Sequence, residues 1–243
     1  GSSQSIASPN VVLNTIMAQE LEEFADVLEQ SNDFQADLQN LLHDTFKAHQ
    51  RIIFNGNGYG EDWVQEAQRR GLSNLRDTVD CMPAYIDPKN IRLFAGHNIL
   101  SETEMRARYE IHLENYCKVT AIEASTLRDM VLRGILPAVN RYTADLTQAI
   151  LHKRELVVPC RVEEDLLQKL SALTGSLYDT MAAINEAMDK APDAEGGIDA
   201  ARYYREEIVR RMEEARQSID QMESLTAAKY WPYPTYADIL FSV

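Results

Sequence analysis

Few residues in this sequence have the types and spacing that chemistry requires. Metal sites built from side chains use His, Cys, Asp or Glu at short spacings on one surface. Neither His-x-x-x-His nor Glu-x-x-His occurs around the five histidines, which are His43, His49, His97, His112 and His152. The three cysteines are equally scattered, at Cys81, Cys117 and Cys160. The sequence therefore predicts no metal ligand, and the isolated thiols favour a reducing, cytoplasmic setting.

Two of these residues are predicted to pack in the core rather than to bind a metal. His112 falls on an apolar helical stripe, so we expect a core histidine with a satisfied hydrogen bond. Cys117 lies on the same helical run and is expected to pack there. His43 and His49 are six residues apart, which places them on different sides of a helix.

Phosphate-binding and nucleophile motifs are also missing from the sequence. The one glycine-rich stretch, Asn55-Gly-Asn-Gly-Tyr-Gly60, could cradle an anion with backbone N–H groups, but a connecting loop between helices is the favoured interpretation. The acidic runs are expected to be solvated helix faces rather than a catalytic carboxylate pair, at 20–23, 163–165 and 213–214. No catalytic, cofactor-binding or metal-binding residue is predicted in this chain.

Composition bounds the class of protein. The 243 residues are 45% hydrophobic and 26% charged, and 38 acidic against 24 basic side chains give a net charge of −14. Nucleic acid is disfavoured as a partner, because phosphate contact needs a basic stripe. A membrane partner is disfavoured too, since no apolar run reaches the roughly 18 residues that a spanning helix needs and no signal peptide opens the sequence.

Helical periodicity runs through most of the chain and predicts a mainly α fold. A helix is expected from Val11 to about Gln30, and Ser31-Asn32-Asp33 breaks the pattern and can cap a second helix that runs to about Gln50. The inward face of the second helix is expected to be Phe34, Leu38, Leu41, Leu42 and Phe46. A short helix over 61–70 ends at Gly71, and another is expected over 88–95. Ser101-x-x-Glu104 is a capping box at the start of a long helix.

That long helix carries a predicted inward stripe of Met105, Tyr109, His112, Tyr116, Val119, Ile122, Thr126 and Met130. Pro137 should kink or split it near Gly134. Beyond Pro159, two apolar seams flank the turn at 191–197 and predict an antiparallel helical hairpin. They comprise Val162, Leu166, Leu170, Leu173, Leu177, Met181, Ile184 and Met188, then Ile198, Ala201, Ile208, Met212, Ala215, Ile219 and Met222.

The last fourteen residues are too aromatic for a disordered tail. Tyr230, Trp231, Tyr233, Tyr236 and Phe241 surround two prolines, so the segment is expected to dock in an extended course. Residues 237–243 could form a strand or a packed hook. The tail is either an intramolecular lock or an anchor for a neighbouring subunit, and the sequence leaves both open.

This tail resembles the C-terminus of type III glutamine synthetases. The opening segment 1–15 is similar to the family segment just after its last active-site strand. Further similarities, in the same order, are Arg51-Ile-Ile-Phe-Asn-Gly-Asn57, Glu114-Asn-Tyr-Cys117 with Ile122-Glu123, and Ile135-Leu-Pro-Ala138. The resemblance implies an enzyme that ligates glutamate and ammonia with ATP and Mg²⁺ or Mn²⁺. It implies a cytoplasmic homo-oligomer of stacked rings, and it places the family's catalytic motifs before residue 1.

The resemblance suggests four parts. Residues 1–30 would be the end of the catalytic domain, 31–156 a helical C-terminal region, 157–228 the long hairpin and 229–243 the aromatic tail. The chain itself would be a non-catalytic structural and oligomerisation part, inactive alone, with the rest of the enzyme as partner. The alternatives are a free-standing helical protein–protein interaction module and, more remotely, a helical-bundle metalloenzyme, which needs Glu-x-x-His pairs that the sequence lacks.

Overall fold

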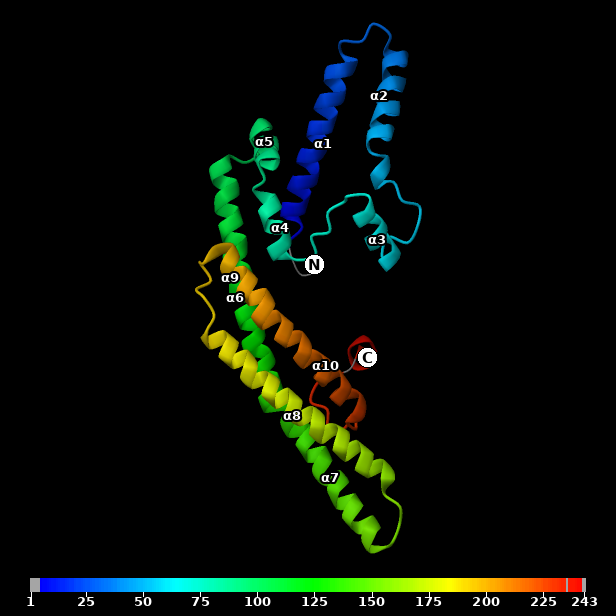
Figure 1. The fold of residues 1–243 in the computed structure, drawn as a ribbon, viewed down its shortest axis with the longest axis vertical. Coiled ribbons are helices and arrows are strands. Elements are labelled where there is room, and N and C mark those ends of the chain that lie inside the picture. Colours follow the sequence, from blue (N-terminus) through cyan, green and yellow to red (C-terminus); the bar gives the residue numbers. More distant parts are fainter. Residues whose placement is uncertain (1–4, 235, 242–243) are drawn as a thin grey trace. The chain divides into compact units, whose positions relative to one another are not determined.

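The computed structural model describes residues 5–234 and 236–241, and over these residues the chain is mainly α-helical without β-strands, as predicted (Figure 1). It divides into two compact units, Gly1–Ile111 and His112–Val243. Residues 1–4 and 242–243, which belong to the opening segment and to the terminal stretch expected as a strand or a packed hook, lie outside the described residues. No helix in the described part is long and apolar enough to cross a lipid bilayer.

The first unit contains the helices α1 (Ala7–Leu28), α2 (Phe34–Ala48), α3 (Glu61–Arg69), α4 (Thr78–Tyr85) and α5 (Pro88–Gly96), with the short helix η1 (Gln50–Ile52) after α2. Aspartates start three of them: Asp33, Asp77 and Asp87 each accept a hydrogen bond from a backbone N–H of the first turn. Helix α4 was not predicted, because Pro83 lies inside it and removes one helical donor.

Gly71 ends α3 as predicted. Its φ of +70° is the left-handed conformation that glycine adopts without strain. The next N–H, from Leu72, reaches back to the carbonyl of Ala67 at 2.9 Å, which closes the helix end. The capping box is also confirmed, because the Ser101 N–H donates to the Glu104 carboxylate at 2.8 Å and the Glu104 N–H donates to Ser101 Oγ at 3.3 Å.

The boundary between the units falls within α6 (Glu102–Met130), whose predicted stripe is wrong after Tyr109. His112, Val119, Ile122, Thr126 and Met130 are exposed. Met105 is buried as predicted. Beyond Tyr109 the buried positions lie one or two residues away from the predicted ones, at Leu113, Cys117, Thr120, Ala124 and Val131. From Cys117 to Ala124 the buried face carries small side chains, Cys117, Thr120 and Ala124, while the larger Val119 and Ile122 remain exposed.

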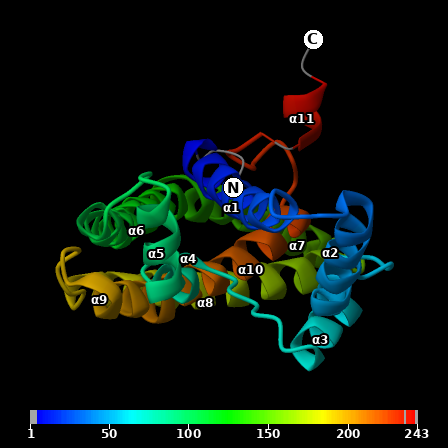
Figure 2. The same ribbon diagram turned by 90° about the horizontal axis from the view of Figure 1, so that it is seen from above.

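The second unit is a set of long packed helices. α6 is followed by the π-helical segment η2 (Val131–Ile135), α7 (Leu136–Glu155) and α8 (Arg161–Asp189). The chain returns through α9 (Gly197–Tyr203), the π-helical segment η3 (Tyr204–Val209) and α10 (Arg210–Leu225), and α10 packs along α8 (Figures 1 and 2). The predicted break near Gly134 is confirmed by η2, since Pro137 offers no N–H to the preceding turn.

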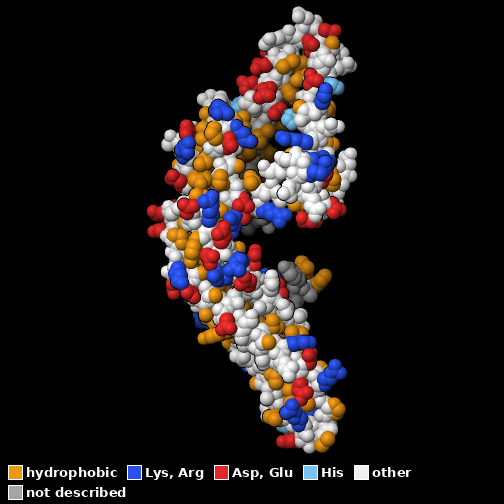
Figure 3. Space-filling model, in the orientation of Figure 1, with side chains coloured by type: hydrophobic (Ala, Val, Ile, Leu, Met, Phe, Trp, Pro, Cys, Tyr) orange, Lys and Arg blue, Asp and Glu red, His pale blue; other side chains and the backbone are white. Residues whose placement is uncertain are grey.

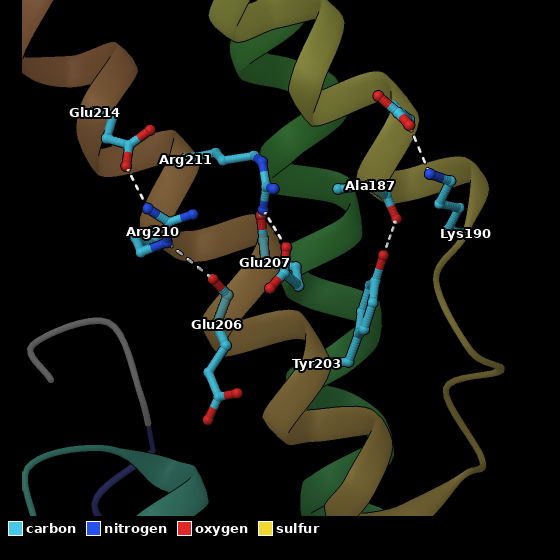
Figure 4. Close-up of polar contacts among 9 residues, drawn as sticks. Ala187, Lys190, Tyr203, Glu206, Glu207, Arg210, Arg211 and Glu214 are labelled. Carbon is cyan, nitrogen blue, oxygen red and sulfur yellow. Dashed lines mark hydrogen bonds and ion pairs between the residues drawn. The ribbon is translucent and has the colours of Figure 1, made fainter.

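The predicted hairpin of α8 with α9–α10 is present, and both seams face inward. Its fully buried residues are Leu170, Leu177, Met181, Ile184, Ala201, Ile208, Ala215 and Met222. Val162, at the start of the first seam, is the exception and is exposed. The turn between Asp189 and Gly197 is held by Tyr203, whose hydroxyl donates to the carbonyl of Ala187 at 2.9 Å (Figure 4).

The π-helical segment η3 was not predicted, and arginine side chains stabilise it. In a π turn the backbone bonds shift by one residue, which leaves carbonyls at its edge in need of donors. Arg210 Nε donates to the Glu206 carbonyl at 3.2 Å, and Arg211 donates to the Glu207 carbonyl (Figure 4). The same arginines pair with the carboxylates of Glu214 and Glu207.

Candidate interaction surface

The first unit exposes the apolar faces of α1 and α2. In α2 none of the fifteen residues, all of them described, is buried. Phe34, Leu42 and Phe46, which the sequence predicted to point inward, are 57%, 43% and 64% exposed. That prediction is wrong, because Leu38 and Leu41, which are only half-buried, take up the available packing against the neighbouring elements.

Helix α1 shows the same pattern. Its one buried residue among those described is Thr15, whose hydroxyl donates to the Val11 carbonyl at 2.7 Å. The exposed apolar side chains of α1 are Val11, Leu13, Ile16, Met17, Leu21 and Val27. Hydrophobic side chains reach the surface along the arm of α1 and α2 in Figure 3. We call the exposed apolar residues of these two helices the α1–α2 face.

Local contacts fix these helices. α1 packs against α2 and α5. His97, just after α5, lies 3.0 Å from Gln19 Oε1 and 3.7 Å from a Glu22 carboxylate oxygen. Ser31 Oγ donates to Asp37 at 2.5 Å across the turn between α1 and α2. The α1–α2 face is therefore presented by a helix pair whose turn and cap are well formed.

Such a face is energetically unfavourable in water. Full burial of one large apolar side chain contributes about 1.5–3 kcal/mol, and contiguous apolar patches of more than a few hundred Å² are typical of interaction sites. Several such side chains on two adjacent helices therefore indicate a surface that packs against another part of a protein.

A cation–aromatic cluster holds the segment after α2. Phe54 and Trp63 stack with ring centroids 4.3 Å apart, and the Arg70 guanidinium lies 5.6 Å from the Trp63 ring. Arg70 also donates to the carbonyls of Arg51 and Ile53, at 3.1 and 2.8 Å. This cluster joins both sides of the loop 55–60.

The geometry of that loop favours a connection over an anion site. The N–H groups of Tyr59 and Gly60 already donate to Asn57, to its side-chain and backbone oxygens, each at 3.1 Å. Glu61 and Asp62 occupy the first turn of α3, where their charge opposes an incoming anion.

Glu66 anchors the cluster and gives a pH prediction. Hydrogen bonds from Arg69 and then Arg70 lower the pKa of Glu66 to about 2. Because the folded pKa lies below the ordinary value of 4.5, the stabilisation is present above pH 4.5 and is lost as pH falls from 4.5 towards 2. We expect a carboxyl titration followed by NMR to show a Glu66 midpoint near pH 2. Replacing Arg69 and Arg70 together by Gln should return it towards 4.5, and a midpoint near 4.5 in the unsubstituted chain would contradict the cluster.

The aromatic tail is docked on its own unit. The Tyr230 ring lies 5.3 Å from that of Tyr142, and its hydroxyl donates to Asp145. The Tyr233 hydroxyl donates to the Met130 carbonyl at 3.3 Å, at the start of η2. The predicted intramolecular lock is thus confirmed for 230–234. Of the two alternatives for 237–243, a strand or a packed hook, the strand is wrong for the described part, because residues 236–240 form the short helix α11 (Tyr236–Leu240). Ile239, Leu240 and Phe241 are exposed.

Gly134 makes room for this tail, which leads to a second prediction. A Cβ at Gly134 would lie 2.7 Å from Tyr233 Oη. Gly→Ala in a helix ordinarily stabilises by about 0.5–1 kcal/mol. We expect Gly134→Ala to give that gain only in a Tyr233→Ala background, and to give less, or a loss, when Tyr233 is present. Urea unfolding of the four proteins in this cycle measures the coupling, and an equal gain in both backgrounds would contradict the contact.

The predicted chemistry-bearing residues do not converge. His43 is exposed beside Asp44, and His112 is exposed, so the expected core histidine is wrong. Burial raises the pKa of the thiols of Cys81 and Cys117, and a contact with the Glu164 carboxylate raises that of Cys160, so all three favour the protonated form. Among residues 5–234 and 236–241, no three His, Cys, Asp or Glu side chains gather in a way that could hold a metal ion.

Comparison with known proteins gives a consistent result along the chain. Residues 37–154 match the family model of the glutamine synthetase C-terminal domain. A glutamine synthetase from Butyrivibrio fibrisolvens is 36% identical over 208 residues, which cover 85% of this chain and 30% of that protein. The type-3 glutamine synthetase of Dictyostelium discoideum is 31% identical over 99% of this chain and 34% of its own length. A glutamine synthetase from Bacteroides fragilis is 28% identical over the whole chain and 35% of its own.

The chain thus spans about a third of the length of these relatives. The matching family model is that of the C-terminal domain, so the chain corresponds to the C-terminal part of these relatives. An independent helical module is not favoured, because similarity to glutamine synthetases runs through the chain and does not stop at a domain edge. The chain belongs to the glutamine synthetase family and corresponds to the C-terminal region of its type III members.

Proposed function

We propose that this chain is a structural, non-catalytic part of a glutamine synthetase, and that its α1–α2 face packs against the catalytic part of the same enzyme. The observation that carries this proposal is the α1–α2 face itself. Phe34, Leu42 and Phe46 on α2 remain exposed within a chain that matches only a third of its relatives' length. The occupant that we propose is the remaining two thirds of such an enzyme, which this chain does not match.

The activity that follows is that of the relatives named above. The complete enzyme would ligate glutamate and ammonia with ATP, with Mg²⁺ or Mn²⁺ bound by residues outside this chain, as a cytoplasmic homo-oligomer. Phosphoryl transfer depends on metal ions and positioned charges. In the described part of this chain many acidic side chains form surface ion pairs with Lys and Arg neighbours on the same or the next helix, for example Lys169–Asp165 at 2.7 Å and Arg154–Glu164 at 2.7 Å.

The test is formation of γ-glutamyl hydroxamate from glutamate, hydroxylamine, ATP and Mg²⁺. We expect activity from the full-length gene product and none from the 243-residue chain alone. Activity in the isolated chain would overturn the non-catalytic role. Inactivity of a folded full-length product, checked by its circular dichroism, would overturn the assignment of the activity.

A further inference from the structure

A cavity of about 450 Å³ lies under the aromatic tail, within the second unit. Its floor is formed by Leu127 and Met130 at the end of α6 and by Ile219 of α10. Trp231 and Tyr233 of the tail form an aromatic wall, and Ile239 of α11 closes another side. Pockets for small organic ligands measure about 300–1,000 Å³ and have mainly apolar walls, so this cavity has a suitable size and lining.

The tail contacts hold this wall in place. Tyr233 is fixed by its hydrogen bond to the Met130 carbonyl and by the space above Gly134. Tyr230, one residue before Trp231, is held by its ring contact with Tyr142 and its hydrogen bond to Asp145. Trp231 lies between these two anchors and is half-buried. The cavity is therefore built from several elements and does not depend on one flexible side chain.

The polar groups at the cavity are mainly acidic. Arg216 and Asp220 lie one helical turn apart and form an ion pair, with Nε 2.5 Å from Oδ1. The side-chain carboxylate of Glu223, on the next turn of α10, makes no hydrogen bond or ion pair with the residues that the structure describes. Because the charges of Arg216 and Asp220 cancel, the carboxylate of Glu223 gives the rim a net negative charge.

We propose that this cavity is a binding site for a small organic cation with an apolar or aromatic body. The body would pack against Trp231, Tyr233 and Ile219, where burial and cation–aromatic attraction both contribute. The cationic group would pair with Glu223 at the rim. A nucleotide or another organic anion would meet the same carboxylate and be repelled. This site is independent of the α1–α2 face and of catalysis.

The probe is 4-phenylbutylamine, which is a cation at pH 7, and its matched anion is 4-phenylbutanoate. In a Trp63→Phe chain, Trp231 is the remaining tryptophan and reports on the cavity by fluorescence. We expect saturable binding of the amine, about fivefold to tenfold tighter than binding of the acid, as a partly exposed charge pair allows. Isothermal titration calorimetry provides a second readout and the stoichiometry.

Two variants assign the charge preference to the rim. Glu223→Gln should remove the preference for the amine, and Glu223→Lys should reverse it. Glu213→Gln makes the same charge change at an exposed position elsewhere on α10 and should leave both affinities unchanged. Glu223 is exposed, so the variants are expected to fold, which circular dichroism checks. Equal affinity for amine and acid, no saturable binding of the amine, or an unchanged preference in Glu223→Gln would each overturn the proposal.

Discussion

Leu177→Ala is expected to lower the free energy of unfolding of the second unit by about 2–5 kcal/mol. Leu177 is 0% exposed and lies on the seam of α8 that packs along α10. Removing its branched side chain loses transfer free energy and leaves a cavity between two long helices that cannot collapse easily. Urea unfolding of a Trp63→Phe chain, followed by Trp231 fluorescence, measures the loss.

The adjacent residue supplies the control. Tyr178 is 61% exposed on the same helix, so Tyr178→Ala should change the free energy of unfolding by no more than about 0.5 kcal/mol. A similar loss for both substitutions would show that α8 does not present Leu177 to a packed seam. A small loss for Leu177→Ala alone would mean that the α8–α10 core is loosely packed.

Phe46→Asp is expected to have little effect on the isolated chain and a large effect on the full-length enzyme. In the chain alone Phe46 is 64% exposed, so the free energy of unfolding should change by no more than about 0.5 kcal/mol. In the enzyme the proposed contact buries Phe46, and a buried aromatic replaced by a smaller side chain loses about 3–5 kcal/mol, with a further penalty for the charge. We expect hydroxamate formation to fall at least tenfold, which corresponds to about 1.4 kcal/mol of lost docking.

Asn40→Asp is the matched control for this experiment. It introduces the same carboxylate into α2, at an exposed position on the opposite side of the helix from Leu42. Its effect on full-length activity should be less than about twofold, since a surface change contributes only a few tenths of a kcal/mol. Equal loss in both variants would point to a general effect of negative charge on α2. Unchanged activity in Phe46→Asp would remove this residue from the contact.

The second unit follows from its sequence because its helices bury their seams within the chain. Apolar residues at steps of three and four place Leu170, Leu177, Ile208 and Met222 in one core, and Pro137 accounts for the break at η2. The buried face of α6 beyond Tyr109 could not be predicted from the sequence in this way. There the buried face contains Cys117, Thr120 and Ala124, and periodicity weighted by side-chain size selects the wrong side.

The partner of the α1–α2 face could not be predicted from the sequence. The spacing of Phe34, Leu42 and Phe46 correctly marks an apolar face, but it carries no information on whether the partner lies inside the chain. The contact of Gly134 with Tyr233 joins residues far apart in sequence, so no local pattern reveals it. The η3 segment is stabilised by Arg210 and Arg211, which in sequence resemble ordinary i, i+4 surface pairs.

The most direct test of the central claim is amide hydrogen exchange of α1 and α2, compared between the isolated 243-residue chain and the full-length enzyme. If the α1–α2 face packs against the catalytic part, the amides of both helices will exchange more slowly in the enzyme, because their opening then requires loss of that contact. The α8–α10 core is the internal reference and should exchange alike in both samples. Equal exchange of α1 and α2 in the two samples would contradict the account.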